Sequence, residues 1–219
     1  NLAAALGIPP EDRQKIVTIA DQKRLIEERT GAKVKQYGQI FKLNPEVSDI
    51  ADTYAFNFKG VNLLVLGAVQ SGGSGCACPE NTLLKALVQD VVLHRNDILI
   101  MDMEPGIEHL GRATARGVTS FIIVVEPGLR SLDSYRRIAG MAGDIGIHKL
   151  HVIANKVRSD MDEALIAQAV GRENIIGTIP FTDSFIVNDR DGRAAIENLD
   201  ERLMAVSYTH LRAHETGRN

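Results

Sequence analysis

Short apolar runs alternate with helical stretches through the second half of the chain. Three runs are apolar at nearly every position, as expected for strands of a parallel sheet covered on both faces, and they span residues 97–101, 119–125 and 150–154. A weaker fourth run spans residues 175–179. Helical stretches separate the later runs, near residues 131–142 and 161–170. This alternation predicts an α/β fold with a mostly parallel sheet and helices on both faces.

The first half of the chain gives a less regular pattern. Charged residues interleave with apolar ones over residues 11–28, which predicts a helix that ends near Gly31. An irregular region follows over residues 38–52. Three further elements are expected: a buried strand at 61–68, a helix at 80–94 and a closing helix at 192–204.

Composition places the chain among ordinary globular proteins. Its 219 residues, 44% hydrophobic and 24% charged, are enough for one domain with a sizeable core. The net charge of -3 gives no reason to expect a nucleic acid or an anionic lipid surface as a partner. The pattern contains no secretory signal and no membrane span, and the cysteines form no disulfide framework. We therefore expect a cytoplasmic protein without nucleic-acid or membrane partners.

Cys76 and Cys78 are the only cysteines of the chain, and one residue separates them in a glycine-rich stretch. Two thiolates at this spacing supply half of the four-ligand shell that structural zinc normally takes. A second copy of the chain would complete the shell, so the pair indicates a metal held across a two-fold axis. The alternative is a chance pair of small buried apolar residues. The flanking glycines and polar residues favour metal or redox use.

A carboxylate follows the apolar run that ends at Met101. Asp102 at a strand end is the arrangement by which nucleotide-binding sheets hold a carboxylate near Mg²⁺. Gly106, shortly afterwards, would let the backbone pass close to a terminal phosphate. An aspartate here also serves as a helix cap, so a purely structural role stays open.

Two further strand ends carry candidate binding residues, and ligands of parallel sheets bind beyond such ends. Asn155 has an amide that can pair with the edge of adenine or guanine, while the stem of Lys156 packs on the ring. Pro180 and Phe181 offer a rigid ring and an aromatic ring that can flank a base. The structural alternatives are an asparagine turn and a helix-initiating proline. The order of these residues on successive strands favours a shared site.

The chain resembles a known family from about Leu2 to Met204. The resemblance is densest in five segments: Cys76-Ala-Cys-Pro-Glu-Asn81, Met101-Asp-Met-Glu-Pro-Gly-Ile-Glu-His-Leu110, Val125-Glu-Pro127, Ala142-Gly-Asp-Ile-Gly-Ile147 and Asn155-Lys-Val157. These segments resemble the CooC-type maturation ATPases of carbon monoxide dehydrogenase, which belong to the MinD/ParA-like deviant P-loop NTPases. The combination of the two-cysteine motif with the segment around Asp102 is specific, whereas the other segments are shared with many relatives.

The resemblance implies a role for each candidate residue. Asp102 would be the switch II carboxylate near Mg²⁺ and the attacking water. Asn155 would read the adenine of ATP, with Pro180 and Phe181 beside it. The two cysteines would bind Ni²⁺ or Zn²⁺ at the interface of a homodimer. Members of the family couple an ATP-driven change of the dimer to nickel delivery into carbon monoxide dehydrogenase, which would be the client here.

The phosphate-binding part of the family pattern is absent from this sequence. No GxxxxGK[ST] loop occurs, and the glycines at 72–75 are not followed by lysine. The family carries that loop ahead of the position of Asn1, so the resemblance implies a truncated chain that binds ATP poorly and is inactive. Residues 206–219 resemble a translated sequencing adapter. We expect a single nucleotide-binding α/β domain over residues 1–205, truncated at its amino terminus, and a non-native tail over 206–219.

Two other functions stay open at the level of sequence. The first is a MinD/ParA-like or nitrogenase-reductase-like ATPase without nickel duty, although reductase relatives carry more widely spaced cysteines. The second is an interaction module without a P-loop, in which Asp102 and Asn155 have no function.

Overall fold

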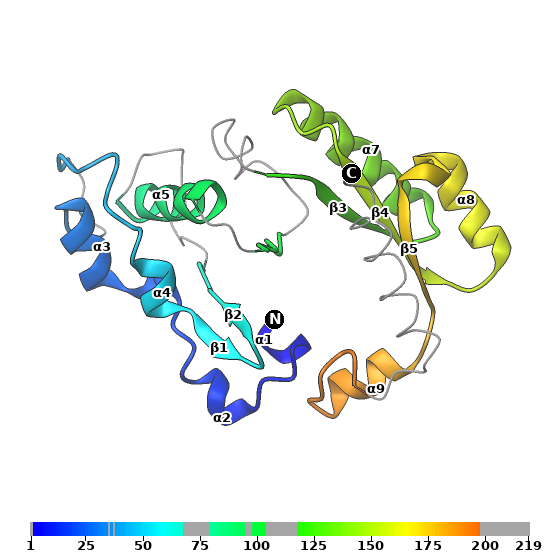
Figure 1. Ribbon diagram of the computed structural model, residues 1–219, viewed down its shortest axis with the longest axis horizontal. Coiled ribbons are helices and arrows are strands. Elements are labelled where there is room, and N and C mark those ends of the chain that lie inside the picture. The colour runs from blue at the N-terminus through cyan, green and yellow to red at the C-terminus, as the bar shows by residue number, and fades with distance from the viewer. Residues whose placement is uncertain are drawn as a thin grey trace, which may run out of the picture. The chain divides into compact units, whose positions relative to one another are not determined.

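The computed structural model describes residues 2–34, 36, 38–67, 79–94, 98–103 and 118–197. The chain divides into two compact units, which Figure 1 colours by position along the sequence. The first unit covers Ile8–Met101. The second unit combines Leu2–Gly7 with the chain from Asp102 onward. The expectation of a single domain over residues 1–205 stays a prediction, and the predicted tail at 206–219 lies outside the described residues.

The second unit is built on a parallel sheet of three strands. The strands are β3 (Phe121–Val125), β4 (Leu150–Val157) and β5 (Ile175–Pro180), and they lie in this order. Helices follow each strand: α7 (Leu129–Asp144), α8 (Asp160–Val170) and α9 (Ser184–Arg190), with a short 3-10 turn, η2 (Arg172–Asn174), before β5. Strands alternating with helices confirm the predicted α/β class with a mostly parallel sheet.

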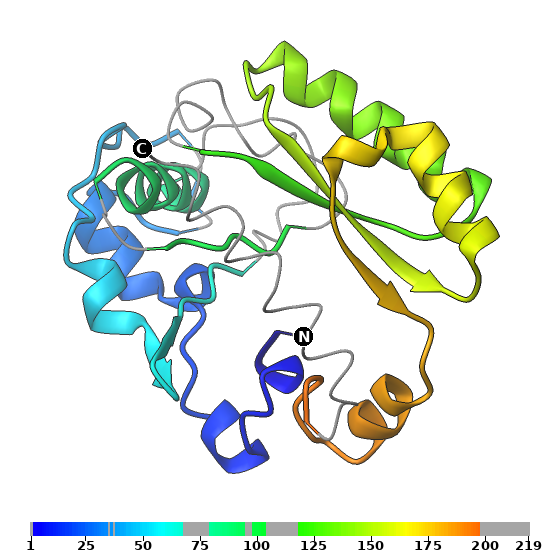
Figure 2. The same cartoon turned by 45° about the vertical axis from the view of Figure 1, so that its right-hand side comes forward.

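Helices α7 and α8 pack together on one face of this sheet, as Figures 1 and 2 show. Side chains alternate along a strand, so Ile123 and Val125 of β3 enter the core while Ile122 and Val124 are each 56% exposed. The buried cluster comprises Ile123, Val125, Leu132, Tyr135, Val152, Ala154, Val157, Ile166 and Val170. This close packing holds β3, β4 and β5 in fixed positions, so the residues at the carboxyl ends of the strands are fixed as well.

The amino-terminal helix α1 (Leu2–Ala5) also belongs to the second unit. The backbone N–H of Ala195 donates to the carbonyl of Ala5 at 2.9 Å, which joins the start of the chain to the turn after α9. Asn188 on α9 is 3% exposed, and its side chain donates to the carbonyls of Ala195 and Glu197. A buried amide that is satisfied in this way holds the turn in one conformation.

The described part of the first unit contains several helices and one β-hairpin. Its elements are α2 (Pro10–Arg13), the 3-10 turn η1 (Ile19–Asp21), α3 (Lys23–Thr30), α4 (Ile50–Tyr54), β1 (Phe56–Phe58), β2 (Val61–Leu63) and α5 (Pro79–His94). Its buried cluster comprises Ile19, Leu25, Ile26, Val47, Ile50, Leu83 and Leu87. The predicted helix at 80–94 is confirmed by α5, and α3 ends next to Gly31 as predicted.

The prediction of one helix over residues 11–28 is wrong. The structure divides this stretch into α2, η1 and α3 because Thr18 forms a parallel β-bridge with Val65. The backbone N–H of Ile19 donates to the carbonyl of Val65 at 3.0 Å. A backbone group that pairs with another segment cannot also make the hydrogen bonds of a continuous helix. The pairing with Val65 therefore interrupts the helix that the local sequence pattern predicts.

The prediction of a buried strand over residues 61–68 is also wrong. Within the described part of this stretch, residues 61–67, only Val61–Leu63 forms a strand, β2, which pairs antiparallel with β1, and Val61 is 50% exposed. The turn between them consists of Lys59 and Gly60, whose φ angles are 49° and 83°. Two consecutive positive φ angles define the tight hairpin turn that suits the twist of the strands. The hairpin was not predicted from the sequence.

Two other predicted elements differ from the structure. The described part of the predicted strand at 97–101 adopts no regular structure, and Ile98 and Ile100 are 96% and 84% exposed. A strand needs a neighbour that accepts its backbone hydrogen bonds, and no described strand pairs with this segment. The described part of the helix predicted at 192–204 forms turns, while α9 precedes it. Among the described helices, none combines the length and the apolar composition that a membrane crossing requires.

One ion pair in the first unit gives a prediction about pH. Arg29 donates to both carboxylate oxygens of Asp49, at 3.0 and 2.7 Å, and these hydrogen bonds lower the pKa of Asp49 from its ordinary 3.8. A carboxylate with a lower pKa in the folded state contributes stability above its unfolded pKa, and this contribution is lost as the pH falls.

We therefore expect Asp49→Asn to flatten the dependence of the free energy of unfolding on pH below about pH 4. Urea unfolding at several pH values, for the wild type and for this variant, measures the slope. Hydrogen bonds from Ser48 also lower the pKa of Glu46, so part of the slope should persist in the variant. Identical slopes in the two proteins would contradict the prediction.

Candidate functional site

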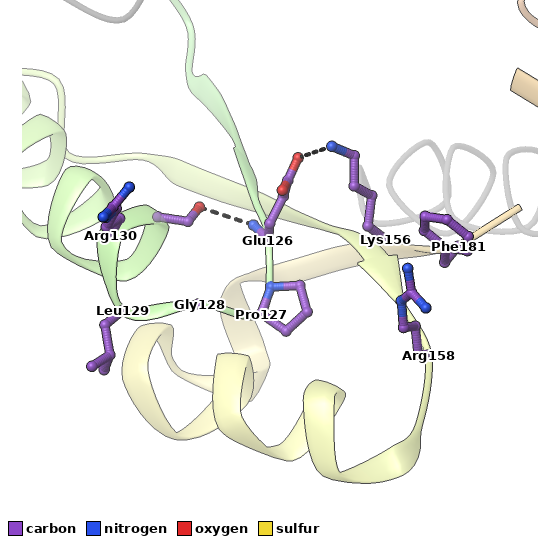
Figure 3. Close-up of a pocket in the computed structure, with 9 residues that line it drawn as sticks. Glu126, Pro127, Gly128, Leu129, Arg130, Lys156, Arg158 and Phe181 are labelled. Carbon is purple, nitrogen blue, oxygen red and sulfur yellow. Dashed lines mark hydrogen bonds and ion pairs between the residues drawn. The ribbon is translucent and has the colours of Figure 1, made fainter. Parts of the chain in front are cut away.

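The strands β3, β4 and β5 end at the same edge of the sheet, and a pocket of about 640 Å³ lies there. Figure 3 shows that its lining comes from three strand ends and from the first turn of α7. The residues that line it are Glu126, Pro127, Gly128, Leu129, Arg130, Ser131, Lys156, Arg158 and Phe181. This is the edge at which ligands of parallel α/β sheets bind.

An ion pair spans the strand ends at the pocket. The Nζ atom of Lys156 lies 2.7 Å from Oε1 of Glu126, and each side chain is about half exposed. Figure 3 shows the two side chains pointing toward each other from β4 and from the end of β3. Exposed ion pairs of this kind add little to the stability of the fold. The effect of this pair is local: the carboxylate of Glu126 offsets the positive charge of Lys156 in the pocket.

The backbone at Lys156 is unusual. Asn155 pairs with Ile179 and Val157 pairs with Pro180, so Lys156 is an extra residue that bulges from the β4 ladder. Its φ angle is 58°, in the left-handed region that residues other than glycine rarely adopt. Bulges of this kind redirect a side chain and concentrate near functional sites. Here the bulge turns Lys156 toward Glu126.

Arg158 and Phe181 also line the pocket, beside Lys156 (Figure 3). The guanidinium carbon of Arg158 lies 3.7 Å from the centroid of the Phe181 ring, which is a stacked cation–π contact. The backbone N–H of Phe181 donates to the carbonyl of Val157 at 2.9 Å. The backbone N–H of Arg158 donates to Oδ2 of Asp162 at 2.8 Å, at the start of α8. Both partners of the stack therefore rise from fixed backbone.

The turn between β3 and α7 closes the pocket. The backbone N–H of Glu126 donates to Oγ of Ser131 at 2.9 Å, which folds the turn back on the helix. Helix α7 begins at Leu129 without a side-chain cap, so its first turn presents partial positive charge. Arg130 lines the same pocket. Three cationic side chains face one carboxylate in the lining, a balance that suits an anionic ligand with an aromatic part.

The structure brings together part of the predicted site. Lys156 and Phe181 line the pocket. Asn155 is half-buried on β4 immediately before the bulge, and Pro180 is the last residue of β5. Asp102 is exposed, belongs to no helix or strand, and is not among the lining residues. Three predicted site residues, Gly106, Cys76 and Cys78, lie outside the described residues.

Three charged residues of the pocket were not predicted: Glu126, Arg130 and Arg158. The rule that identified Asn155 applies equally to Glu126, because both stand at the carboxyl end of a parallel strand. Arg158 follows Lys156 by two positions, and only the contact with Phe181 reveals it. Within the described ranges, no cluster of three or more His, Cys, Asp or Glu side chains is arranged to hold a metal ion.

Comparison with known proteins identifies the family. No family model matches the chain. The chain is 40% identical to an uncharacterized ATP-binding protein of Methanocaldococcus jannaschii, MJ0823, over 92% of this chain and 77% of that protein. It is 39% identical to the carbon monoxide dehydrogenase accessory protein CooC of Rhodospirillum rubrum, over 88% of this chain and 73% of that protein.

Among solved structures, a chain of the MinC:MinD cell division protein complex of Aquifex aeolicus gives a TM-score of 0.41 and 22% identity, over 52% of this chain and 50% of that one. The two sequence relatives are similar to the chain over most of their length. The chain therefore belongs to the CooC-type family of MinD/ParA-like ATP-binding proteins.

Proposed function

We propose that this protein is an ATP-dependent maturation factor that assists nickel insertion into carbon monoxide dehydrogenase. The observation that carries the proposal is the 39% identity with CooC over 192 residues. The presence of Cys76 and Cys78 in the sequence supports a metal function. In this proposal the protein works in the cytoplasm as a homodimer, and the dehydrogenase is its client.

The pocket at the sheet edge is the proposed site for the base of ATP. Its volume and its excess of cationic side chains suit part of a nucleotide. The amide of Asn155 would hydrogen-bond the edge of the adenine, and Lys156, Pro180 and Phe181 would contact its ring. Arg130 and the first turn of α7 offer further positive charge to the anionic ligand.

Hydrolysis is assigned to a second group of residues. The exposed carboxylate of Asp102 is a ligand type that Mg²⁺ accepts. Bound Mg²⁺ would neutralise charge on the phosphates during transfer. Asp102 would orient the attacking water, and the backbone at Gly106 would approach the terminal phosphate. These roles are proposals that rest on the family pattern.

The metal in this proposal is cargo rather than a resident cofactor. Cys76 and Cys78 of each protomer would supply four thiolates across the two-fold axis of the homodimer. Such a set suits Zn²⁺ and accepts Ni²⁺ in square-planar form. Because linkage is reciprocal, ATP and metal would change each other's affinity by the same factor.

The decisive experiment uses the full-length protein and its Cys76→Ser/Cys78→Ser variant. We expect the wild type to bind one Ni²⁺ or Zn²⁺ per two chains, with an affinity that ATP changes. The variant should lose roughly 100-fold or more in metal affinity, because only thiolates provide the soft ligands. Equilibrium dialysis with and without ATP measures both quantities.

Two alanine variants, one at the pocket and one as a control, test the nucleotide-binding part of the proposal. Asn155→Ala should weaken ATP binding, while Asn62→Ala should not, since Asn62 contacts Asn57 within the hairpin of the first unit. Full metal affinity in the double-serine variant would contradict the nickel proposal and leave the ATPase proposal standing.

The second candidate function is that of a MinD/ParA-like ATPase that does not handle nickel. The 40% identity to MJ0823, a protein named for ATP binding, supports it. Nickel-dependent activation of carbon monoxide dehydrogenase by the protein and ATP would decide in favour of the first candidate.

A further inference from the structure

We propose that Arg158 is a nucleotide-binding residue whose guanidinium plane stacks on the base, with the Phe181 ring behind it as support. This inference rests on the proposed function, because it assumes that the pocket receives the base of a nucleotide. It changes the role assigned to Phe181 from direct contact with the base to support of the residue that makes this contact.

The geometry of the stack is the first argument. The guanidinium carbon lies 3.7 Å from the ring centroid, which is the spacing of two stacked planar groups. One face of the ring is therefore covered, and Phe181 is 37% exposed. Arg158 itself is exposed and lines the pocket. A base that enters the pocket consequently meets a flat cationic plane, and bases stack readily on arginine planes.

The fixed backbone of both residues is the second argument. Phe181 is held through its N–H to the carbonyl of Val157, and Arg158 is held through its N–H to Asp162. Asp162 lies in the first turn of α8, where its backbone N–H donates to Oγ of Ser159 at 3.3 Å. The platform is thus formed before any ligand arrives, which lowers the entropic cost of binding.

The charge of Arg158 is the third argument. Within the described residues, Lys156 is paired with Glu126, whereas the side chains of Arg158 and Arg130 make no ion pair. An arginine that stacks on an aromatic ring keeps its edge donors available, since stacking uses only its faces. Glu126 neutralises Lys156, whereas no carboxylate in the described part of the chain neutralises Arg158. The charge of Arg158 and the free face of its guanidinium group are therefore available to a ligand.

The experiment compares ATP with inorganic triphosphate, which carries the phosphates without the base. Isothermal titration of the full-length protein gives both affinities for the wild type, Arg158→Ala and Arg158→Lys. We expect Arg158→Ala to weaken ATP binding on the order of tenfold and to leave triphosphate binding unchanged. Arg158→Lys should lose nearly as much, because lysine keeps the charge and loses the plane. Arg136→Ala is the matched control, since Arg136 pairs with Asp133 on α7 away from the pocket.

Each other outcome overturns the inference. An equal loss for ATP and triphosphate would mean that Arg158 acts only through its charge on phosphate. Tighter ATP binding by Arg158→Ala would mean that Arg158 blocks the ring that the base needs. Unchanged ATP binding by Arg158→Ala would show that Arg158 has no role in nucleotide binding. A wild type that binds neither ligand would overturn the proposed function as well, and thermal melting of each variant separates loss of fold from loss of binding.

Discussion

Replacing Gly67 with alanine will destabilise the first unit by about 2–5 kcal/mol. Two effects combine at this position. The φ angle of Gly67 is 79°, which costs a residue with a β-carbon about 1–2 kcal/mol. The added β-carbon would also overlap with Cγ2 of Thr18. The side chain of Thr18, or the segment that carries Thr18 and Ala20, must shift to relieve this overlap.

The shift is costly because backbone pairing fixes both segments. Thr18 bridges Val65, and the N–H of Ala20 donates to the carbonyl of Leu66 at 2.9 Å. Movement of Thr18 would therefore break hydrogen bonds that hold Ile19 in the core. The pairing that divides the predicted helix is thus the same pairing that demands glycine at residue 67.

A matched substitution separates the two effects. Gly38 has a φ angle of 74° and no atom within 4 Å of its would-be β-carbon, so Gly38→Ala reports the backbone cost alone. Urea unfolding followed by circular dichroism measures both variants. Thr18→Ser in the Gly67→Ala background should recover part of the loss by removing Cγ2. If Gly67→Ala costs no more than Gly38→Ala, the predicted overlap does not exist.

Truncating Ile166 to alanine will destabilise the second unit by about 2–5 kcal/mol. Ile166 of α8 is fully buried in the cluster between this helix, α7 and the sheet. The substitution removes apolar contacts and leaves a cavity, which the rigid sheet cannot fill by collapsing. The same chemical change at Leu165 should cost far less, because that neighbouring side chain is 40% exposed.

The helix α8 also supports the pocket, which gives this prediction a second measurement. The first turn of α8 holds Arg158 through Asp162, so loosening the helix should reduce ligand affinity together with stability. Chemical unfolding of Ile166→Ala and Leu165→Ala gives the two free energies. Similar costs for the two variants would show that α8 does not pack against the sheet as described.

The parallel sheet could be predicted from sequence because apolar residues dominate its strands, although β4 also carries His151, Asn155 and Lys156. The predicted strands correspond to β3, β4 and β5, and the helices that follow in the chain cover their core-facing side chains. The hairpin of β1 and β2 could not be predicted in the same way. Its strands are short and half-exposed, and its signal is the turn at Lys59 and Gly60, where lysine adopts a conformation that local preference disfavours.

The candidate site was predictable only in part, for a related reason. Strand ends are visible in sequence, and they identify Asn155, Lys156, Pro180 and Phe181 as neighbours of one edge. Contacts between side chains of different strands are not visible. The bulge that turns Lys156 toward Glu126 and the stack of Arg158 on Phe181 depend on the register between β4 and β5, which only the structure provides.

The placement of Leu2–Gly7 in the second unit has a consequence for synthesis on the ribosome. The partner of Ala5 is Ala195, so the first helix must wait for almost the entire described chain before it can make this contact. Contacts that close such a long loop form late, whereas the intervening unit can assemble as soon as its own residues emerge. We expect nascent chains halted before the Ala195 codon to protect the core helices α3 and α5 from protease while leaving α1 open to cleavage.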